Sequence, residues 1–518
     1  MSYLNELVQP TQKQPIMGKT MVKNNEGGYV FEVNKWDYLK RFLILGTEGG
    51  SFYCGQTQMS QDTAKNTIEC IKEDGLRVLS ILKEINPIKE DTRIFTLALL
   101  ATYGDLDVKS KTYTSIKEFC YTPTLLFMFC DFVTKMRGWS SGLVRGVKRY
   151  YLETSPERLA LQIMKYQSRN DWNHADVLNL VHPKPVTPEQ DSIFKYIIKQ
   201  EITESTPKFI EVAHNCLKNK YKESEVIDFI KEYDLPREVI PTEMLKGKNI
   251  WKALLVKMPY IALVRNLGNL TKLEVLKSPL QAEVKDVIAR ITNEEMINKL
   301  NINPMFLLVA HATYESGCGF KGSGNWTPVK QILDALEKAY YLSFKYVKPT
   351  NKNFLLGIDV SGSMRSPISG KNVSSAQAAA TLAMVIARQE SNYEIMGFAQ
   401  EFRNLNISSE DSLSEAMKKT YDNNFGATDC SLPMIYAMKN RLDVDCFIVI
   451  TDSETYQGNT HPSSALKLYN KSMNKNAKMI VIATESNNIS IADPSNPNML
   501  DISGFSDNIL QIIQEFVK

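Results

Sequence analysis

The sequence of 518 residues lacks the features that would assign it to several large classes of proteins. No apolar run approaches the roughly 18–20 residues that a membrane-spanning helix needs. The first residues do not show the charged and then apolar order of a secretory signal. With 43% hydrophobic and 23% charged residues, the chain is predicted to be a globular protein of the cytoplasm, or of the nucleus in a eukaryote, without a membrane partner.

Cysteine and histidine are few, and their spacing does not suit a zinc site. The eight cysteines include no C-x-x-C pair, and the five histidines form neither H-E-x-x-H nor H-x-x-x-H. We therefore expect buried, reduced thiols and no zinc enzyme. The G-x-x-x-x-G-K-[ST] loop of P-loop enzymes and the G-x-S-x-G turn of α/β-hydrolases are also missing.

The patterns divide the chain into three parts. Residues 1–28 are polar and are predicted to form a flexible N-terminal arm. Residues 29–350 carry apolar residues at helical spacing in short segments that proline and glycine separate, as at 62–84, 115–137, 157–167, 191–204 and 250–267. This pattern predicts an all-α helical-repeat domain. An irregular helical domain is the alternative, because no strict sequence period is present.

Residues 351–518 have a different pattern, in which short apolar strands alternate with amphipathic helices. The expected strands are 354–360, 393–398, 446–450 and 479–483, and the expected helices are 372–388, 413–420, 432–441, 463–473 and 509–517. The alternation predicts a Rossmann-like, doubly wound α/β domain with a buried parallel sheet.

Charge follows the same division. Residues 351–518 contain 14 Lys+Arg and 18 Asp+Glu, a balance of −4, so the rest of the chain holds 47 basic and 40 acidic residues, a balance of +7. The two domains are therefore expected to have different partners.

Three oxygen-rich loops occur in the C-terminal domain. D-V-S-G-S at 359–363 follows the first strand, G-A-T-D at 426–429 precedes a helix, and T-D-S at 451–453 follows another strand. Function in doubly wound sheets concentrates at the carboxyl ends of strands, so we expect these loops to meet. Carboxylate and hydroxyl oxygens suit one divalent cation, Mg²⁺ or Mn²⁺. The expected ligands are Asp359, Ser361, Ser363, Thr428 and Asp452, the last acting through water.

Other interpretations of these loops stay open. Each hydroxyl could cap the helix that follows it. A haloacid-dehalogenase-type phosphatase would need a second aspartate where this chain has Ser361. The pattern D-x-S-x-S followed by T and D instead resembles the metal-ion-dependent adhesion site of von Willebrand factor A domains. In that family the metal keeps an open position that a partner's carboxylate completes, which implies binding without catalysis.

A basic stretch lies in the helical part between residues 135 and 169. It holds eight Lys or Arg residues against two glutamates, with aromatic residues interleaved. Basic charge attracts phosphates and exposed aromatic rings stack on bases, so the composition favours RNA as a partner. A solvated helix face with its aromatic residues in the core is the alternative. The candidates for RNA contact within the stretch include Arg145, Lys148 and Arg149.

From about residue 29 to the C-terminus, the chain resembles the Ro autoantigen family, the Y-RNA-binding proteins of animals and some bacteria. The resembling stretches, in colinear order, are R-F-L-I-L-G-T-E-G-G-S-F-Y at 41–53, K-Y-x-x-R-N-x-W-x-H-x-D at 165–176, H-P-K-P at 182–185, W-K-A-L-L at 251–255, M-P at 258–259, A-L-V-R-N-L-G at 262–268, the loop at 359–364, T-D-C-S-L-P-M at 428–434 and I-A-D-P at 491–494. Gly362 and Ala427 depart from the animal pattern, in which alanine and glycine are expected.

The resemblance implies a TROVE domain at 29–350, a ring of HEAT-like repeats that a von Willebrand factor A domain at 351–518 closes. It implies small noncoding Y-like RNAs on the outer surface, single-stranded ends of misfolded RNAs in a central cavity, and a role in RNA quality control and stress survival. At the metal site, a protein carboxylate or an exonuclease is the expected partner. By motif, Lys165, Arg169 and His182 correspond to the Y-RNA surface, and Arg265 and Asn266 to the cavity side.

Plainer roles remain for these residues. His182 could be a turn histidine, Arg265 and Asn266 could form a polar helix end, and Trp172 and Trp251 are expected in the core. Two rival functions also remain. One is a metal-dependent adhesion or scaffold protein with incidental RNA binding, and the other is a metal-dependent nuclease or phosphatase.

Overall fold

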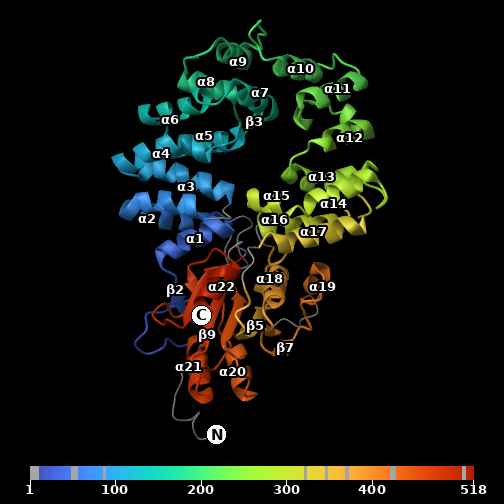
Figure 1. The fold of residues 1–518 in the computed structure, drawn as a ribbon. Helices are drawn as coiled ribbons and strands as arrows, with labels where there is room; N and C mark the ends of the chain where they lie inside the picture. Colours follow the sequence, from blue (N-terminus) through green and yellow to red (C-terminus); the bar gives the residue numbers. More distant parts are fainter. Residues whose placement is uncertain are drawn as a thin grey trace. The chain divides into compact units, whose positions relative to one another are not determined.

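The structure is a computed structural model that describes residues 11–47, 56–85, 89–319, 324–344, 348–367, 373–420, 427–504 and 509–518 (Figure 1). Its contacts divide the chain into two compact units. Unit 1 comprises residues 1–66, 291–322 and 330–518, and unit 2 comprises residues 67–290 and 323–329. This division differs from the predicted boundaries at 28 and 350, because both ends of the predicted helical domain belong to the compact unit of the C-terminal domain.

Unit 2 is built from short helices that follow one another along the chain (Figure 1). They are α3 (Glu90–Tyr103), α4 (Leu106–Phe119), α5 (Pro123–Met136), α6 (Ser141–Leu152), α7 (Pro156–Lys165), α8 (His174–Val181), α9 (Pro188–Lys199), α10 (Lys208–Leu217), α11 (Glu223–Tyr233), α12 (Lys248–Val256), α13 (Tyr260–Lys272) and α14 (Ala282–Ile291). Helix α2 (Gln56–Glu84), which is bent at Asp74, contains the boundary between the units. The main contacts join α3 with α5, α4 with α6 and α11 with α12. Such local pairing is what a helical-repeat protein requires.

Proline and capping residues set where many helices begin. Pro123, Pro156 and Pro188 stand in the first turns of α5, α7 and α9, where a missing amide hydrogen costs no hydrogen bond. The Thr187 hydroxyl accepts a hydrogen bond from the Gln190 amide at 3.2 Å and caps α9. The prediction that proline separates short helices is therefore confirmed at Pro123 and Pro156.

Two predicted helices are each divided in the structure. The range 115–137 contains the end of α4 at Phe119 and the start of α5 at Pro123. The range 250–267 is interrupted between α12 and α13, where Pro259 precedes Tyr260. Proline cannot continue a preceding helix because it has no amide hydrogen and its ring clashes with the turn before it.

The centre of unit 1 is a six-stranded sheet. Its strands are β5 (Asn353–Asp359), β6 (Asn392–Phe398), β7 (Phe402–Asn404), β8 (Cys446–Thr451), β9 (Lys478–Ala483) and β11 (Met499–Ser503). They lie in the order β11-β9-β8-β5-β6-β7, and every pair is parallel except β6 with β7. The predicted doubly wound α/β domain is thus confirmed, with two edge strands, β7 and β11, that the sequence pattern missed.

Helices cover both faces of this sheet. The helices of unit 1 are α1 (Lys35–Leu45), α15 (Glu294–Lys299), α16 (Pro304–Glu315), α17 (Lys330–Leu342), α18 (Ser375–Gln389), α19 (Leu413–Lys418), α20 (Leu432–Lys439), α21 (Pro462–Met473) and α22 (Ile509–Val517). Leu355 and Val449 share a core cluster with Met434 of α20 and Leu466 of α21. Leu356 follows Leu355 in β5, so its side chain points to the opposite face of the sheet, and it is also fully buried.

The N-terminal residues 11–28 are not a flexible arm. Strand β1 (Val22–Lys23) pairs with β2 (Tyr29–Glu32), and β2 pairs with β10 (Ile489–Ser490) of the C-terminal domain. Val30 and Phe31 of β2 are buried. The polar composition was misleading because these polar side chains bond to the C-terminal domain, as described below. The first ten residues of the predicted arm lie outside the described residues.

The segment after β2, which begins the stretches that resemble the Ro family, also packs within unit 1. Arg41 of α1 is 1% exposed, pairs with Asp501, and donates to the backbone oxygens of Asn487 at 3.0 Å and Ile489 at 2.8 Å. A buried guanidinium needs partners for its charge, and these contacts of its two terminal nitrogens tie α1 to β10 and β11. Residues 48–53 of the same resembling stretch lie outside the described residues.

The prediction of buried thiols holds for most of the described cysteines but not for Cys318. In the described part of the chain the seven cysteines are free, and six of them are buried while Cys318 is exposed. Among the same residues, no helix has both the length and the apolar composition that crossing a bilayer requires.

His174, at the start of α8, lies inside unit 2. Its Nδ1 atom is 3.0 Å from the Tyr151 hydroxyl, and its ring packs edge-on against Phe127 at 4.9 Å between centroids. Burial lowers the pKa of His174 from 6.5 to about 3. The imidazole therefore stays neutral in the folded protein across the physiological range.

We expect His174 to make unit 2 less stable in mild acid. Below pH 6.5 the unfolded chain binds a proton at this residue and the folded chain does not, so the free energy of unfolding falls as pH falls. Between pH 7 and pH 5, the free energy of unfolding of His174→Gln should fall by about 2 kcal/mol less than that of wild type. Denaturant unfolding followed by tryptophan fluorescence measures this, because four of the five tryptophans belong to unit 2. Tyr151→Phe, which retains the imidazole, should keep the wild-type dependence, and equal slopes in all three proteins would contradict the assignment.

Candidate metal site and basic surface

The candidate metal site lies where the winding of the sheet reverses. From β5 the chain crosses to β6 on one side, and later enters β8 on the other side. Asp359 is the last residue of β5, and Thr451 is the last residue of β8. Because the two strands are parallel neighbours, their carboxyl ends bring the loops 359–363 and 451–453 together.

Hydroxyl and amide groups hold the Asp359 carboxylate. Its Oδ1 accepts the Ser361 amide at 2.9 Å, and its Oδ2 accepts the Thr451 hydroxyl at 2.6 Å. The Ser361 and Ser363 hydroxyl oxygens are 3.2 Å apart. The structure therefore brings the predicted ligands Asp359, Ser361 and Ser363 into one cluster. Thr451 positions Asp359, a role that the sequence did not single out.

Asp452 supplies a second buried carboxylate beside the first. Its Oδ1 accepts the Glu454 amide at 3.0 Å, whereas its Oδ2 accepts no hydrogen bond from the described residues. Burial and the charge of Asp452 together raise the pKa of Asp359 from 3.8 to about 7, and burial also raises the pKa of Asp452. Two neighbouring carboxylates whose pKa values are raised in a buried site favour a bound cation.

The third loop is joined to the segment that follows Asp452 by three hydrogen bonds to one carbonyl. The Thr428 carbonyl accepts the amides of Tyr456 at 3.0 Å and Gln457 at 3.2 Å, and the Thr455 hydroxyl at 3.3 Å. Thr428 is therefore fixed against the segment that follows Asp452. Gly426, at the start of the predicted loop, lies outside the described residues.

The donor set fits a hard divalent cation. Two carboxylates and three hydroxyls are all oxygen donors, and all five residues are at most 3% exposed. The Oδ2 atom of Asp452 is a buried acceptor with no hydrogen-bond donor among the described residues. Buried polar atoms of this kind are rare in native proteins unless an ion or water serves them. Mg²⁺ and Mn²⁺ prefer such oxygen ligands and usually keep some water.

The two departures from the animal pattern do not strain the loops. Gly362 has φ −59° and ψ −38°, an ordinary helical conformation that alanine also adopts. Ala427 is not among the described residues with positive φ, so it occupies no conformation that demands glycine. The substitutions therefore leave the ligand loops in conformations that both residue types share.

The predicted basic residues of α6 face solvent. Arg145 and Arg149 are exposed and Lys148 is half-buried. Residues three and four apart lie on one helix face, so the three form a common basic face. Arg149 pairs with Glu153 at 2.6 Å, which neutralises part of the charge. The core aromatic residues Tyr150 and Tyr151 point the other way and are buried.

Lys165 and Arg169 are not on one helix, although they are four positions apart in the sequence. Lys165 is the last residue of α7, and its ammonium lies 5.3 Å from the Tyr166 ring centre. Arg169 belongs to strand β3 (Ser168–Arg169), which pairs with β4 (Trp172–Asn173). Tyr166 ends α7 in a non-helical conformation (φ −118°, ψ 80°), and the hairpin turns at Asn170 and Asp171, whose φ values of 50° and 62° suit a two-residue hairpin loop. Arg169 is exposed on it.

His182 ends α8 and is exposed. It adopts a left-handed conformation (φ 46°, ψ 63°), and its amide donates to the Leu178 carbonyl at 2.8 Å. The backbone of His182 therefore forms the turn that ends α8, as the alternative interpretation expected, and its side chain is exposed at the surface. Helix α8 packs against α6, so His182 and the basic face of α6 belong to neighbouring helices.

Arg265 and Asn266 lie in the middle of α13, so they do not form a polar helix end. The Asn266 side chain donates to the Ala262 carbonyl at 2.7 Å and accepts from Arg237 at 3.4 Å. Asn266 and Arg237 also line a hollow of about 540 Å³, together with Lys246 and Asn269. Arg237, Lys246 and Asn269 were missed because no single local motif joins them.

The two tryptophans in question have different surroundings. Trp251 is 3% exposed and its indole donates to the Leu245 carbonyl at 2.7 Å, so its expected place in the core is confirmed. Trp172 is half-buried and its ring lies 6.1 Å from that of Trp139. A partly exposed pair of indoles beside Arg169 offers stacking surface as well as core contact.

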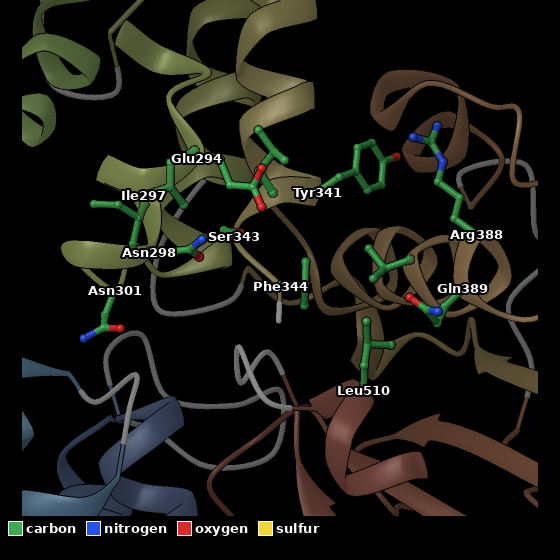
Figure 2. A pocket seen from close by; sticks show the side chains of 13 residues that line it. Glu294, Ile297, Asn298, Asn301, Tyr341, Ser343, Phe344, Arg388, Gln389 and Leu510 are labelled. Atoms are coloured by element: carbon green, nitrogen blue, oxygen red, sulfur yellow. The ribbon is translucent and has the colours of Figure 1, made fainter. Parts of the chain in front are cut away.

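A further hollow of about 740 Å³ lies in unit 1, away from the predicted residues. Figure 2 shows Tyr341 and Arg388 on one side of it and Glu294 and Asn298 on the other. Arg388 donates to the Ser409 carbonyl at 2.7 Å and stacks on Tyr341 at 3.8 Å. The basic group at this hollow is therefore engaged by its own domain.

Two family models match this chain. The TROVE domain matches residues 22–235 and 235–315, and the Ro60 vWA domain matches residues 353–517. The second match contains β5 and β8 with the loops of the candidate metal site. The first contains all the basic candidates described above.

Similar proteins span nearly the same length. The chain is 33% identical over 524 residues to RNA-binding protein RO60 of Deinococcus radiodurans, covering 99% of this chain and 98% of that protein. It is 31% identical over 580 residues to RNA-binding protein RO60 of Caenorhabditis elegans, covering 96% and 90%. The crystal structure of the D. radiodurans RO (RSR) protein matches with a TM-score of 0.66 at 31% identity, covering 93% of this chain and 99% of that one. The chain therefore belongs to the Ro family, which joins a TROVE domain to a Ro60 vWA domain.

Proposed function

We propose that this protein binds RNA through unit 2 and does not act on it chemically. The observation that carries the proposal is the exposed basic face of α6 with the neighbouring end of α8, inside the TROVE match. Relatives that align with nearly the full chain are named RNA-binding proteins. Phosphates need such exposed cations, and the half-buried indoles of Trp139 and Trp172 add stacking surface.

Within this function we assign two kinds of RNA to different residues. Folded small Y-like RNAs bind the surface of Arg145, Lys148, Lys165, Arg169 and His182. Single-stranded ends of misfolded RNAs bind the cavity side at Arg265 and Asn266, where the hollow beside Arg237 offers amide and guanidinium groups. Such groups pair with the edges of unstacked bases. The resemblance to the Ro family implies a role in RNA quality control and stress survival, and we include that role in the proposal.

The C-terminal domain in this proposal binds one Mg²⁺ or Mn²⁺. Asp359, Ser361, Ser363 and Thr428 would hold the ion, and Asp452 would act through water. The bound ion supplies a coordination position for an oxygen of a partner, such as a protein carboxylate or an exonuclease. Because most of the ligands are neutral, we expect a dissociation constant on the order of 10⁻⁴–10⁻³ M.

Asp359→Asn should abolish Mn²⁺ binding without unfolding the protein. The amide oxygen of the variant still accepts the bond from the Ser361 amide, and its NH2 group can donate to the Thr451 hydroxyl oxygen in place of the bond that the carboxylate accepts. The change removes one of two buried negative charges. The metal-free variant should therefore be at least as stable as wild type at pH 8, where repulsion between Asp359 and Asp452 is greatest. Calorimetric titration with Mn²⁺ and thermal unfolding in EDTA measure the two effects. Glu410→Gln, which removes an exposed charge from the same domain, is the control, and unchanged Mn²⁺ binding in Asp359→Asn excludes the site.

The double change Lys165→Ala, Arg169→Ala should weaken the binding of folded RNA more than the binding of a single-stranded tail. Each lost phosphate contact should lower the log–log slope of affinity against salt by about one unit. Lys218→Ala, Lys220→Ala removes the same charge from an exposed turn of unit 2 and is the matched control. Filter binding at several salt concentrations gives the slopes. Equal losses of affinity for both RNAs would indicate one shared surface. No loss of affinity would support the alternative that the basic stretch is a solvated helix face.

RNA binding should need neither the metal nor a catalytic step. The acidic balance of −4 in residues 351–518 disfavours phosphate there, whereas the balance of +7 elsewhere favours it. Labelled RNA incubated with the protein and Mn²⁺ should stay at full length, and EDTA should leave its binding unchanged. Shortened RNA would support the nuclease alternative instead.

A further inference from the structure

The N-terminal residues 11–32 lie against the loops of the candidate metal site, more than 400 positions away in the sequence. Strand β2 carries this segment onto β10, and Phe31 packs edge-on against His461 at 5.4 Å. The His461 imidazole is 3.0 Å from the Tyr29 carbonyl. We call residues 11–32 the N-terminal clip.

Gln12 of the clip joins two of the metal-site loops. Its side-chain amide donates to Asp429 at 2.7 Å, next to Thr428, and its side-chain oxygen accepts the Thr455 hydroxyl at 2.5 Å, three residues after Asp452. The same amide donates to the Thr460 carbonyl at 2.9 Å. Gln12 is fully buried, so each of these bonds is made away from water, where losing a partner is costly.

Asn24 and Asn25 fix the segment after Asp452. The Asn24 side chain donates to the carbonyls of Thr455 at 2.8 Å and Ser453 at 3.4 Å, and the Asn25 amide donates to Glu454 at 2.8 Å. Ser453 has φ 69°, a left-handed conformation that is energetically unfavourable for any residue other than glycine. Such a conformation persists when surrounding contacts determine it, and Asn24 bonds to both carbonyls that flank Glu454.

Gly28 allows the clip to lie directly on this segment. A Cβ atom at Gly28 would stand 1.9 Å from the Thr455 carbonyl oxygen, a backbone atom that cannot turn aside. The Gly28 amide donates to the Asn24 side chain at 2.8 Å, and the Tyr29 amide donates to the Gln12 carbonyl at 2.8 Å. Hydrogen bonds within the clip therefore connect its two contact points, Gln12 and Asn24.

We propose that Gln12 and Asn24 are positioning residues of the metal site, which hold the loops of Thr428 and Asp452 at the separation that one cation requires. The inference rests on the proposed metal site and adds to it a set of residues outside the vWA match, which begins at residue 353. Groups that orient metal ligands usually change metal affinity by about 10–100-fold when they are removed. A clip that only stabilised the fold would leave the affinity of the folded protein unchanged.

The experiment compares Gln12→Ala with Gln14→Ala, since Gln14 is exposed on the same segment. Calorimetry with Mn²⁺ well below the unfolding temperature should give about tenfold weaker binding for Gln12→Ala and the wild-type affinity for Gln14→Ala. Gln12→Glu, which keeps the length and the acceptor but loses the amide donor, should also bind more weakly. Gln12→Glu replaces Gln12→Ala in the comparison if Gln12→Ala does not fold.

Hydrogen exchange in EDTA tests the clip without the metal. Gln12→Ala should lose protection at the amides of Cys430, Tyr456 and Gln457, which bond to Thr455 and Thr428, but not within β8 or β9. Coupling is reciprocal, so Mn²⁺ should increase the protection of the Tyr29 amide in wild type.

The two hypotheses can fail separately. If wild type binds no Mn²⁺, the metal site is wrong, and the exchange data alone decide whether Gln12 orders the loops. If wild type binds Mn²⁺ and both folded Gln12 variants bind it equally well, the positioning role is overturned. Unchanged protection at Cys430 and Tyr456 overturns it as well.

Discussion

The arrangement of the C-terminal domain depends on two aspartates that parallel strands bring together without exposing them to water. Asp359 ends β5, and Asp452 directly follows β8. Because both are buried, each charge disfavours the other, and the pKa of Asp359 rises to about 7. The Thr451 hydroxyl, the Ser361 amide and the Glu454 amide compensate part of this cost. The Oδ2 atom of Asp452 accepts no hydrogen bond from the described residues, and a bound cation would compensate its charge.

In unit 2, by contrast, the basic side chains of the candidate RNA surface lie at the surface of the protein. Arg145, Arg149 and Arg169 are exposed, while the aromatic residues between them, such as Tyr150 and Tyr151, are buried. The buried tyrosines and His174 hold the helices together, so the basic side chains carry little of the packing. A surface of this kind is suited to a polyanion, because binding requires no rearrangement of the core.

The parallel strands and the loops at their ends were predictable, because runs such as residues 446–450 are apolar on both faces and end in oxygen-bearing side chains. The β3–β4 hairpin was not, since two-residue strands leave no alternation to detect, and the spacing of Lys165 and Arg169 looked helical. The contacts of Gln12 were also beyond reach. A polar residue in a polar segment carries no sign of a partner 443 positions away.

That separation has a consequence for biosynthesis. Gln12 leaves the ribosome when its partner Thr455 has not been made, and at about 5–20 residues per second the delay is some tens of seconds. During this interval β2 has no β10 to pair with, and the buried side chains Val30, Phe31 and Arg41 have no domain to cover them. The N-terminal clip therefore cannot be completed in the nascent chain until residues 455–490 have been translated, so the segment that comes first in the sequence is among the last parts of unit 1 to be fixed.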